Sequence, residues 1–229
     1  DKPQYGRGRI PNLIDALQME RLLAPHGPYN RVLRPSDGKM PDSIAYIHAL
    51  VRDYDVVIEQ FRPGVMERLG LGYAALRAVN PHLIYCSITG YGQTGPYRDR
   101  AGHDINYLAM AGVASHAGRK ASGPPPLGIQ VADVAGGSHH AVMGILAAVI
   151  HRQHTGEGQY IDISMTDAAF ALNAMAGAAC LAGGQLPAPE ADLLNGGSFY
   201  DYYATADERW LAVGSLEPQF LERLCVLIG

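Results

Sequence analysis

Short apolar runs alternate with stretches of helical periodicity through the first three quarters of the chain. The runs suit buried parallel strands and cover residues 55–59, 83–89 and 159–163. Apolar residues at helical spacing predict helices over residues 10–23, 41–51, 65–69, 73–79, 131–153 and 165–181. This succession of strands and helices predicts an α/β fold with a doubly wound, Rossmann-like large domain.

The pattern changes in the last quarter of the chain. Residues 200–204 and 210–213 have the composition of short strands, and a helix is expected from residue 218 to residue 227. We therefore predict two domains: residues 1–183 form part of a large α/β domain, and residues 184–229 begin a smaller α+β domain.

The composition excludes several classes of partner. The 229 residues carry a formal charge of −4, which disfavours nucleic acid. Hydrophobic residues make up 48% of the chain and charged residues 17%, so much of it is expected to lie in a core or an interface. It contains no run of about 18 uninterrupted apolar residues, so no membrane contact is expected.

Cysteine and histidine usage predicts no metal site. Cys86, Cys180 and Cys225 are far apart and form no C-x-x-C pair, which fits a reducing cytoplasm. His151 and His154 lie three residues apart, but no third ligand follows at a suitable spacing.

The glycine pattern at Gly90, Gly92 and Gly95 matches the G-x-G-x-x-G signature of dinucleotide-binding folds. That signature needs a helix directly after the last glycine, so that the helix N-terminus meets a pyrophosphate. Residues 96–100 are not apolar-periodic, and nicotinamide binding is therefore disfavoured.

Three polar residues stand at predicted helix starts, where two roles are open to each. His103 precedes an apolar helical run, Asp133 opens an otherwise apolar helix, and Glu217 precedes Pro218. Each side chain is suited either to capping the helix or to acid–base chemistry beside a ligand. The spacing alone does not choose between these roles.

Several segments together resemble the class III coenzyme A transferase family, the carnitine-CoA-transferase-like proteins. The segments follow one another in family order and at compatible spacing: residues 55–74, 80–97, 101–108, 131–138, 155–166 and 214–220. Within that family, the sequences GHDINY at residues 102–107 and LEPQ at residues 216–219 are similar to the alpha-methylacyl-CoA racemase branch.

The resemblance implies a set of site residues. His103 and Asp133 would be the two catalytic acid/bases, and Glu217 would complete the site from the partner subunit of an interlocked homodimer. No metal and no cofactor beyond coenzyme A itself are implied. The expected contacts of the acyl-CoA substrate are Ser36, Asp37, Gly38, Lys39, Gln60, Phe61, Arg62, Arg68, Gly102, His103, Asp104, Ile105, Asn106 and Tyr107.

The implied activity is racemisation or epimerisation by 1,1-proton transfer at the carbon alpha to an acyl-CoA thioester. One alternative is CoA transfer between carboxylic acids through an aspartyl-CoA thioester at Asp133. A second alternative is an acyl-CoA-binding relative without catalysis. By comparison with the family, the chain is expected to lack segments at both ends of the subunit.

Overall fold

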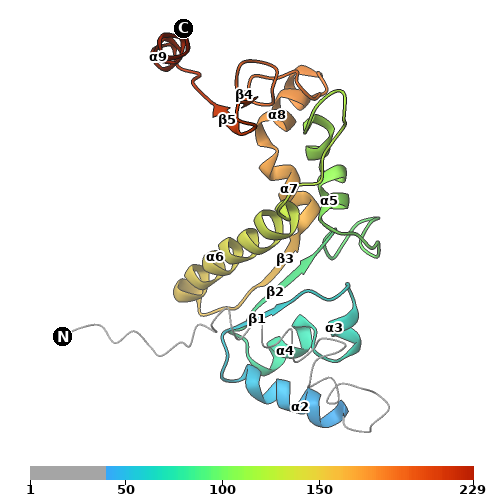
Figure 1. The fold of residues 1–229 in the computed structure, drawn as a ribbon. Helices are drawn as coiled ribbons and strands as arrows, with labels where there is room; N and C mark the ends of the chain where they lie inside the picture. The colour runs from blue at the N-terminus through green and yellow to red at the C-terminus, as the bar shows by residue number, and fades with distance from the viewer. Residues whose placement is uncertain (1–39) are drawn as a thin grey trace, which may run out of the picture. The chain divides into compact units, whose positions relative to one another are not determined.

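The computed structural model describes residues 40–229 of the chain (Figure 1). Two compact units divide the chain: the first ends at Ala101 and resumes over Asp133–Ala168, and the second comprises Gly102–Ala132 and Ala169–Gly229. The helix predicted over residues 10–23 lies outside the described residues. The domain boundary predicted after residue 183 stays a prediction.

A three-stranded parallel sheet forms the centre of the first unit. Its strands β1 (Val56–Glu59), β2 (Ile84–Thr89) and β3 (Tyr160–Ser164) pair in the order β1-β2-β3. The three predicted strands are therefore confirmed, as is a mixed α/β fold with a parallel sheet. The doubly wound form of the complete large domain stays a prediction.

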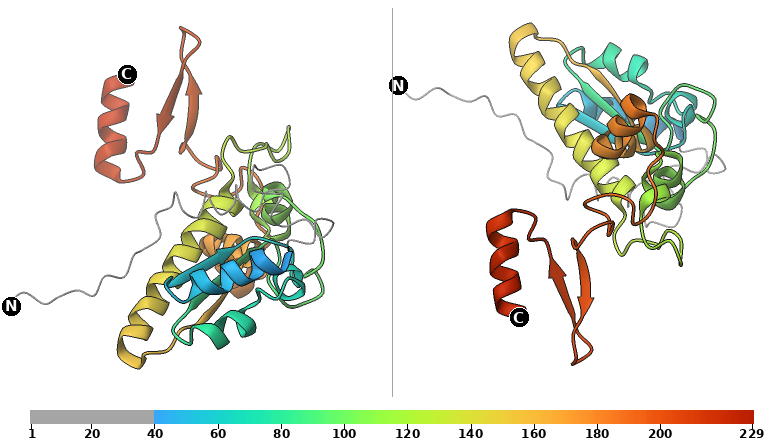
Figure 2. Two further views of the ribbon diagram at one scale, coloured as in Figure 1. Left: turned by 90° about the horizontal axis from the view of Figure 1, so that it is seen from below. Right: turned by 90° about the horizontal axis from the view of Figure 1, so that it is seen from above.

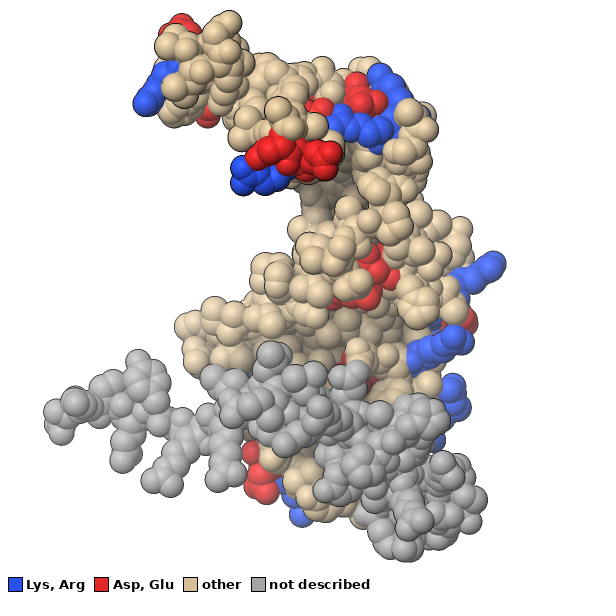
Figure 3. Space-filling model, viewed as in Figure 1, with Lys and Arg blue, Asp and Glu red and all other residues tan. Residues whose placement is uncertain are grey.

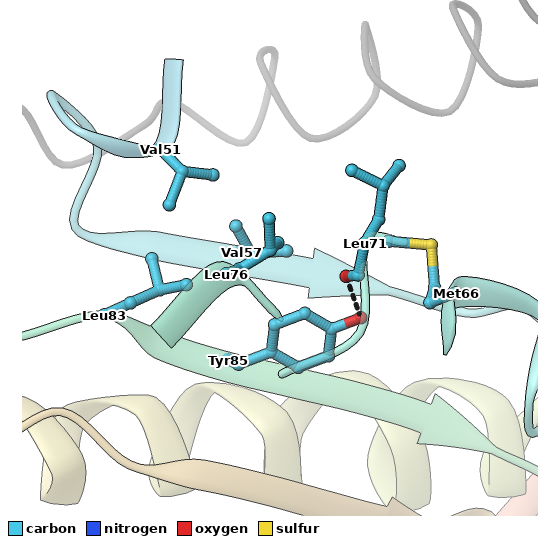
Figure 4. Packing of buried hydrophobic residues seen from close by; sticks show 7 residues of the cluster. All are labelled: Val51, Val57, Met66, Leu71, Leu76, Leu83 and Tyr85. Atoms are coloured by element: carbon cyan, nitrogen blue, oxygen red, sulfur yellow. Dashed lines mark hydrogen bonds between the residues drawn. The ribbon is translucent and has the colours of Figure 1, made fainter. Parts of the chain in front are cut away.

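The hydrophobic core lies between one face of this sheet and three helices (Figure 4). These helices are α2 (Met40–Val51), α3 (Val65–Arg68) and α4 (Tyr73–Val79), all close to the predicted ranges. Val57 and Leu76 lie side by side in this cluster, and the Tyr85 ring extends toward Leu71, where its hydroxyl donates a hydrogen bond to the Leu71 carbonyl at 3.2 Å. The alternation of side chains along each strand sends every second residue into this core.

The opposite face of the sheet is covered by a long helix (Figure 1). The single helix predicted over residues 131–153 is in fact a π-helix, η4 (Ala132–His139), followed by the α-helix α6 (His140–Thr155). Gly144 allows α6 to approach β3 closely, because a Cβ there would lie 3.1 Å from the Ile161 Cγ2 atom. Small residues on this side of α6 thus bring the helix close to the sheet.

The outer side of α6 is apolar and exposed, with Val142, Met143, Leu146 and Ile150 each more than half exposed. By length and composition alone, Ala132–Thr155 is long and apolar enough to cross a membrane, a property that core helices of soluble proteins share. Ala141 and Ala148 are buried on its inner side, as expected for a helix that packs on a sheet. The view in Figure 3 shows that much of the described surface carries neither acidic nor basic side chains.

Gly158 precedes β3 at a point where the backbone of a neighbouring segment leaves no space for a side chain. A Cβ at this position would lie 2.0 Å from the Leu83 carbonyl oxygen, and the Gly158 N–H donates to the Pro81 carbonyl at 3.1 Å. We expect Gly158→Ala to lower the free energy of unfolding by about 1–3 kcal/mol, measured by urea denaturation. Gly183→Ala is the matched control, because nothing lies within 4 Å of a Cβ there. Equal midpoints for Gly158→Ala and the wild type would contradict this account.

The second unit is built from short elements. The helix α5 (Asp104–Met110) and the 3-10 helix η3 (Val113–His116) are followed later by α8 (Ala174–Gly183), a hairpin and α9 (Pro218–Ile228). The two short strands predicted here are present as β4 (Asp201–Ala204) and β5 (Trp210–Val213), and the structure pairs them in antiparallel register (Figure 2).

One helix that was predicted to be continuous is interrupted in the structure. The helix expected over residues 165–181 is two helices, α7 (Met165–Leu172) and α8, bent by 78° at Asn173. The Asn173 Oδ1 atom accepts a 3.0 Å hydrogen bond from the His116 ring Nε2, so a tertiary contact holds the residue at the break. Apolar periodicity continues through such a bend and does not reveal it.

A charged cluster ties two distant segments of the second unit together. The Arg119 guanidinium donates to both carboxylate oxygens of Asp201, at 2.5 and 2.6 Å, and to Glu190 at 3.2 Å. The other Glu190 oxygen accepts the Lys120 backbone N–H at 2.9 Å. The Arg119 guanidinium lowers the pKa of Asp201, and the Lys120 N–H followed by Arg119 lowers the pKa of Glu190.

Because both carboxyl pKa values are lowered in the folded chain, the stabilisation by this cluster is present above the ordinary carboxyl pKa of about 4 and is lost as the pH falls through the lowered values. We expect Arg119→Ala to give several-fold faster limited proteolysis over residues 186–197 at pH 7. In the wild type, hydrogen exchange there should quicken below about pH 4 after correction for the intrinsic rate. The control is Arg209→Ala, which removes an exposed ion pair with Asp207 within the β4–β5 turn. Unchanged cleavage of the Arg119 variant would contradict a clamping role.

Candidate active site

The carboxyl ends of the three parallel strands meet at one edge of the sheet in the first unit. Residues 60–64 leave β1 at this edge, and the glycine-rich segment of residues 90–95 leaves β2. Thr166, just after β3, donates both its backbone N–H and its hydroxyl to the Gly90 carbonyl, at 3.0 and 2.7 Å. Ligands of open α/β sheets bind at this edge, so it is the candidate active site.

The glycine-rich segment is not a dinucleotide fingerprint. Turns and bends follow Gly95, and the next helix in the described chain, α5, begins only at Asp104. Gly92 has a φ of 78°, and the Asp162 carboxylate accepts the Gln93 N–H at 2.9 Å. The expectation that the motif lacks its helix is confirmed.

Asp133 lies in the first turn of η4, which reaches the same edge of the sheet. A Cβ on Gly137 would lie 3.1 Å from the Met165 Cγ atom and 3.3 Å from the Ile88 Cγ2 atom, so η4 packs where β2 and β3 end. The widened turns are held in part by His140, whose Nδ1 lies 2.7 Å from the Ala135 carbonyl oxygen. Eight residues of π-helix are unusual, and π-helical segments are frequent at functional sites.

His103 is the N-cap residue of α5, and its side chain is exposed. The Asn106 side chain accepts the His103 backbone N–H at 3.0 Å, while the His103 carbonyl accepts the N–H groups of Asn106 and Tyr107. The Tyr107 hydroxyl donates to the Gly102 carbonyl at 2.6 Å. Residues 104–107 are thus the first turn of a helix rather than a loop, and they fix the backbone beneath His103.

The remaining predicted residues are distributed over both units. Arg68 ends α3 in the first unit, and Glu217 is the exposed N-cap of α9 in the second. His103 belongs to the second unit and Asp133 to the first, so their pairing stays a prediction. Ser36, Asp37, Gly38 and Lys39 lie outside the described residues.

No group of three or more His, Cys, Asp or Glu side chains over the described residues is arranged to hold a metal ion.

Sequence reasoning missed a row of polar residues on the core face of the sheet. Glu59, Ser87 and Asp162 are paired across the three strands, and Glu59 is only 8% exposed. Burial raises the pKa of the Glu59 carboxyl, against the opposing effect of hydrogen bonds from Ser87 and the Phe61 N–H. The sequence did contain one indication of this row, because an acidic residue, Glu59, ends the apolar run of residues 55–59.

The parallel sheet with helices on both faces defines an α/β protein, and its candidate ligand site lies where the strands end. A profile of the CoA-transferase family III matches residues 37–229. The chain belongs to this family, which confirms the resemblance seen in the sequence.

Relatives with different activities have the same sequence identity to this chain. The chain is 42% identical over 195 residues to the alpha-methylacyl-CoA racemase of Homo sapiens, covering 84% of this chain and 51% of that protein. It is also 42% identical over 195 residues to the succinate–glutarate CoA-transferase of Agrobacterium fabrum, covering 85% of this chain and 48% of that protein. The crystal structure of a CAIB/BAIF family protein from Brucella suis superposes with a TM-score of 0.71 at 34% identity, over 82% of this chain and 49% of that one. The chain thus spans about half the length of these relatives.

Proposed function

We propose that the protein containing this chain is an acyl-CoA racemase or epimerase that moves a proton at the carbon alpha to the thioester. The observation that carries this proposal is the placement of Asp133 in a π-helix at the carboxyl edge of the sheet. The similarity to the human racemase and the racemase-like residues 102–107 and 216–219 support it.

The chemistry needs two groups on opposite faces of one carbon. A proton alpha to a thioester is weakly acidic, so its removal requires a positioned base and hydrogen-bond donors for the enolate oxygen. His103 takes the proton from one epimer, and Asp133 donates a proton to the other face of the planar enolate. In the reverse direction the two residues exchange roles. The substrate is neither oxidised nor reduced.

An exchange experiment tests this function in the intact protein. The protein is incubated with a single epimer of a 2-methylacyl-CoA in deuterated water, without an acceptor acid. Deuterium uptake at the alpha carbon together with loss of optical purity is expected. CoA transfer that appears only when a carboxylic acid is added, without deuterium uptake, would overturn the racemase assignment.

The second candidate is a CoA transferase, which the similarity to the succinate–glutarate CoA-transferase supports. Here the Asp133 carboxylate attacks the thioester carbonyl and expels CoA thiolate, giving a mixed anhydride. The thiolate then attacks the aspartyl carbonyl, releasing the first acid and leaving an aspartyl-CoA thioester. Trapping of this thioester by hydroxylamine separates the transferase from the racemase.

The proposal extends to the oligomeric state of the protein and to its location in the cell. The exposed apolar side of α6 supports a homodimer in which Glu217 of the partner subunit completes the site. Coenzyme A enters as part of the substrate, with no metal, nucleic acid or membrane involved, and the protein acts in the cytoplasm. Sedimentation of the intact protein as a monomer at micromolar concentration would contradict the dimer.

A further inference from the structure

A line of polar contacts crosses the core face of the sheet near its carboxyl edge. Glu59 of β1 is in register with Ser87 of β2, so their side chains lie on the same face of the sheet. Tyr85, drawn in Figure 4, is two residues before Ser87 and shares that face. Glu59 and Ser87, at 8% and 2% exposed, are therefore buried beside the hydrophobic core.

The Glu59 carboxyl holds the segment that follows its own strand. One carboxyl oxygen accepts the Phe61 backbone N–H at 2.8 Å. Ser87, which is only 2% exposed, hydrogen-bonds to the same carboxyl group and accepts the Tyr160 hydroxyl at 3.1 Å. A chain of donors from Tyr160 through Ser87 thus orients Glu59, and Glu59 orients residues 60–62.

Burying a carboxyl group in such a place costs free energy, and an apolar residue of similar size would avoid the cost. The charged groups that act on Glu59 are Glu67 and Asp162, which are acidic and raise its pKa further. Because neither group is basic, attraction between opposite charges does not explain why a carboxyl group is buried at this position. The hydrogen bond to the Phe61 N–H is the contact that an apolar residue cannot replace.

We propose that Glu59 is a positioning residue for substrate binding: it fixes the backbone of residues 60–62 so that exposed Arg62 meets the phosphates of the CoA ester. This inference rests on the proposed function, because it assumes that the ligand is a CoA ester. Arginine suits phosphate recognition because its planar fork of donors binds two oxygens at once, which requires a fixed approach. The Arg62 carbonyl also accepts the Val65 N–H at 3.1 Å, so the far side of the segment is anchored by α3.

The test compares two substitutions at Glu59 in the intact protein. Glu59→Met keeps the side-chain volume and removes the acceptor, and it is expected to fold because the buried group becomes apolar. We expect it to raise KM for the CoA ester about tenfold with kcat unchanged. A tenfold change is the size expected when the displaced Arg62 loses one hydrogen bond to a charged phosphate. Glu59→Gln keeps an oxygen that accepts the Phe61 N–H and is expected to restore most of the wild-type KM.

A truncated substrate separates positioning from a general structural role. The pantetheine thioester of the same acyl group lacks the nucleotide phosphates, so its KM should be equal for Glu59→Met and the wild type. In an Arg62→Ala background, Glu59→Met should have no further effect on KM, because the group it positions is gone. Glu157→Ala, at an exposed acidic residue just before β3, is the matched control.

The outcomes distinguish this proposal from the proposed function. If the wild type turns over the CoA ester and Glu59→Met has the same KM, or loses both substrates equally, the positioning role is overturned alone. If the wild type neither binds nor converts any CoA ester, both proposals fail. Should Glu59→Met not fold, Tyr160→Phe removes the donor to Ser87 and must raise KM in the same direction for the proposal to stand.

Discussion

Asp133→Asn is expected to stop inversion at the alpha carbon of the substrate. Exchange of the alpha proton with solvent should continue for one of the two epimers. The asparagine amide has nearly the same shape as the carboxyl group but neither accepts nor donates the proton at this step. His103 still removes the alpha proton of its own epimer and returns a deuteron to the same face. We therefore expect racemisation to fall by a factor of about 10²–10⁴, with deuterium uptake in one epimer only and without inversion. Mass spectrometry and chiral chromatography of the recovered acyl group measure the two quantities separately.

The matched control for this variant is Asp167→Asn, which removes the acidic residue from the first turn of α7. Both substitutions alter the charge at a helix start by the same amount, so their effects on helix stability should be similar. Full racemisation by the Asp133 variant would exclude Asp133 as an acid/base. Loss of hydroxylamine-trappable thioester in that variant, with no exchange in the wild type, would instead favour the transferase.

His103→Ala is expected to give the complementary result. Asp133 then exchanges the alpha proton of the other epimer only, and racemisation falls by a similar factor of about 10²–10⁴. Because His103 is exposed and its backbone is held by Asn106, the substitution should leave α5 intact, as circular dichroism would show. His154→Ala, in the last turn of α6, is the control. If His103→Ala retained full racemisation in both directions, the two-base mechanism would be wrong.

His103 also separates the two candidate reactions. Nucleophilic CoA transfer needs the Asp133 carboxylate but no second base at the alpha carbon. A transferase should therefore survive His103→Ala with most of its activity and be abolished by Asp133→Asn. A racemase should lose inversion in both variants.

The sequence predicted the local elements well where one physical pattern dominates. The apolar runs that became β1, β2 and β3 are short and bounded by turns, so buried strands were the consistent interpretation. The helices α2 and α4 also follow directly from apolar spacing. The family, too, could be identified from the quoted motifs, and the profile match confirms it.

Interruptions within helices were not predictable in the same way. The π-helix at η4 and the bend at Asn173 keep apolar residues in a continuous pattern, so periodicity does not mark them. Both depend on contacts far away in the sequence: Gly137 lies against Ile88 and Met165, and Asn173 bonds to His116. Such contacts exist only once the chain is folded.

The sequence by itself determined the strands, most of the helices, the family and the residues suited to acid–base chemistry at helix starts. Only the tertiary structure decided that Glu59 is buried beside Ser87 and holds the Phe61 N–H, and that Asp133 lies in the widened turns of η4, whose Gly137 packs against Ile88 and Met165. The physical reason is that periodicity records which side of an element is apolar, whereas a functional site depends on strand register and close packing between distant segments.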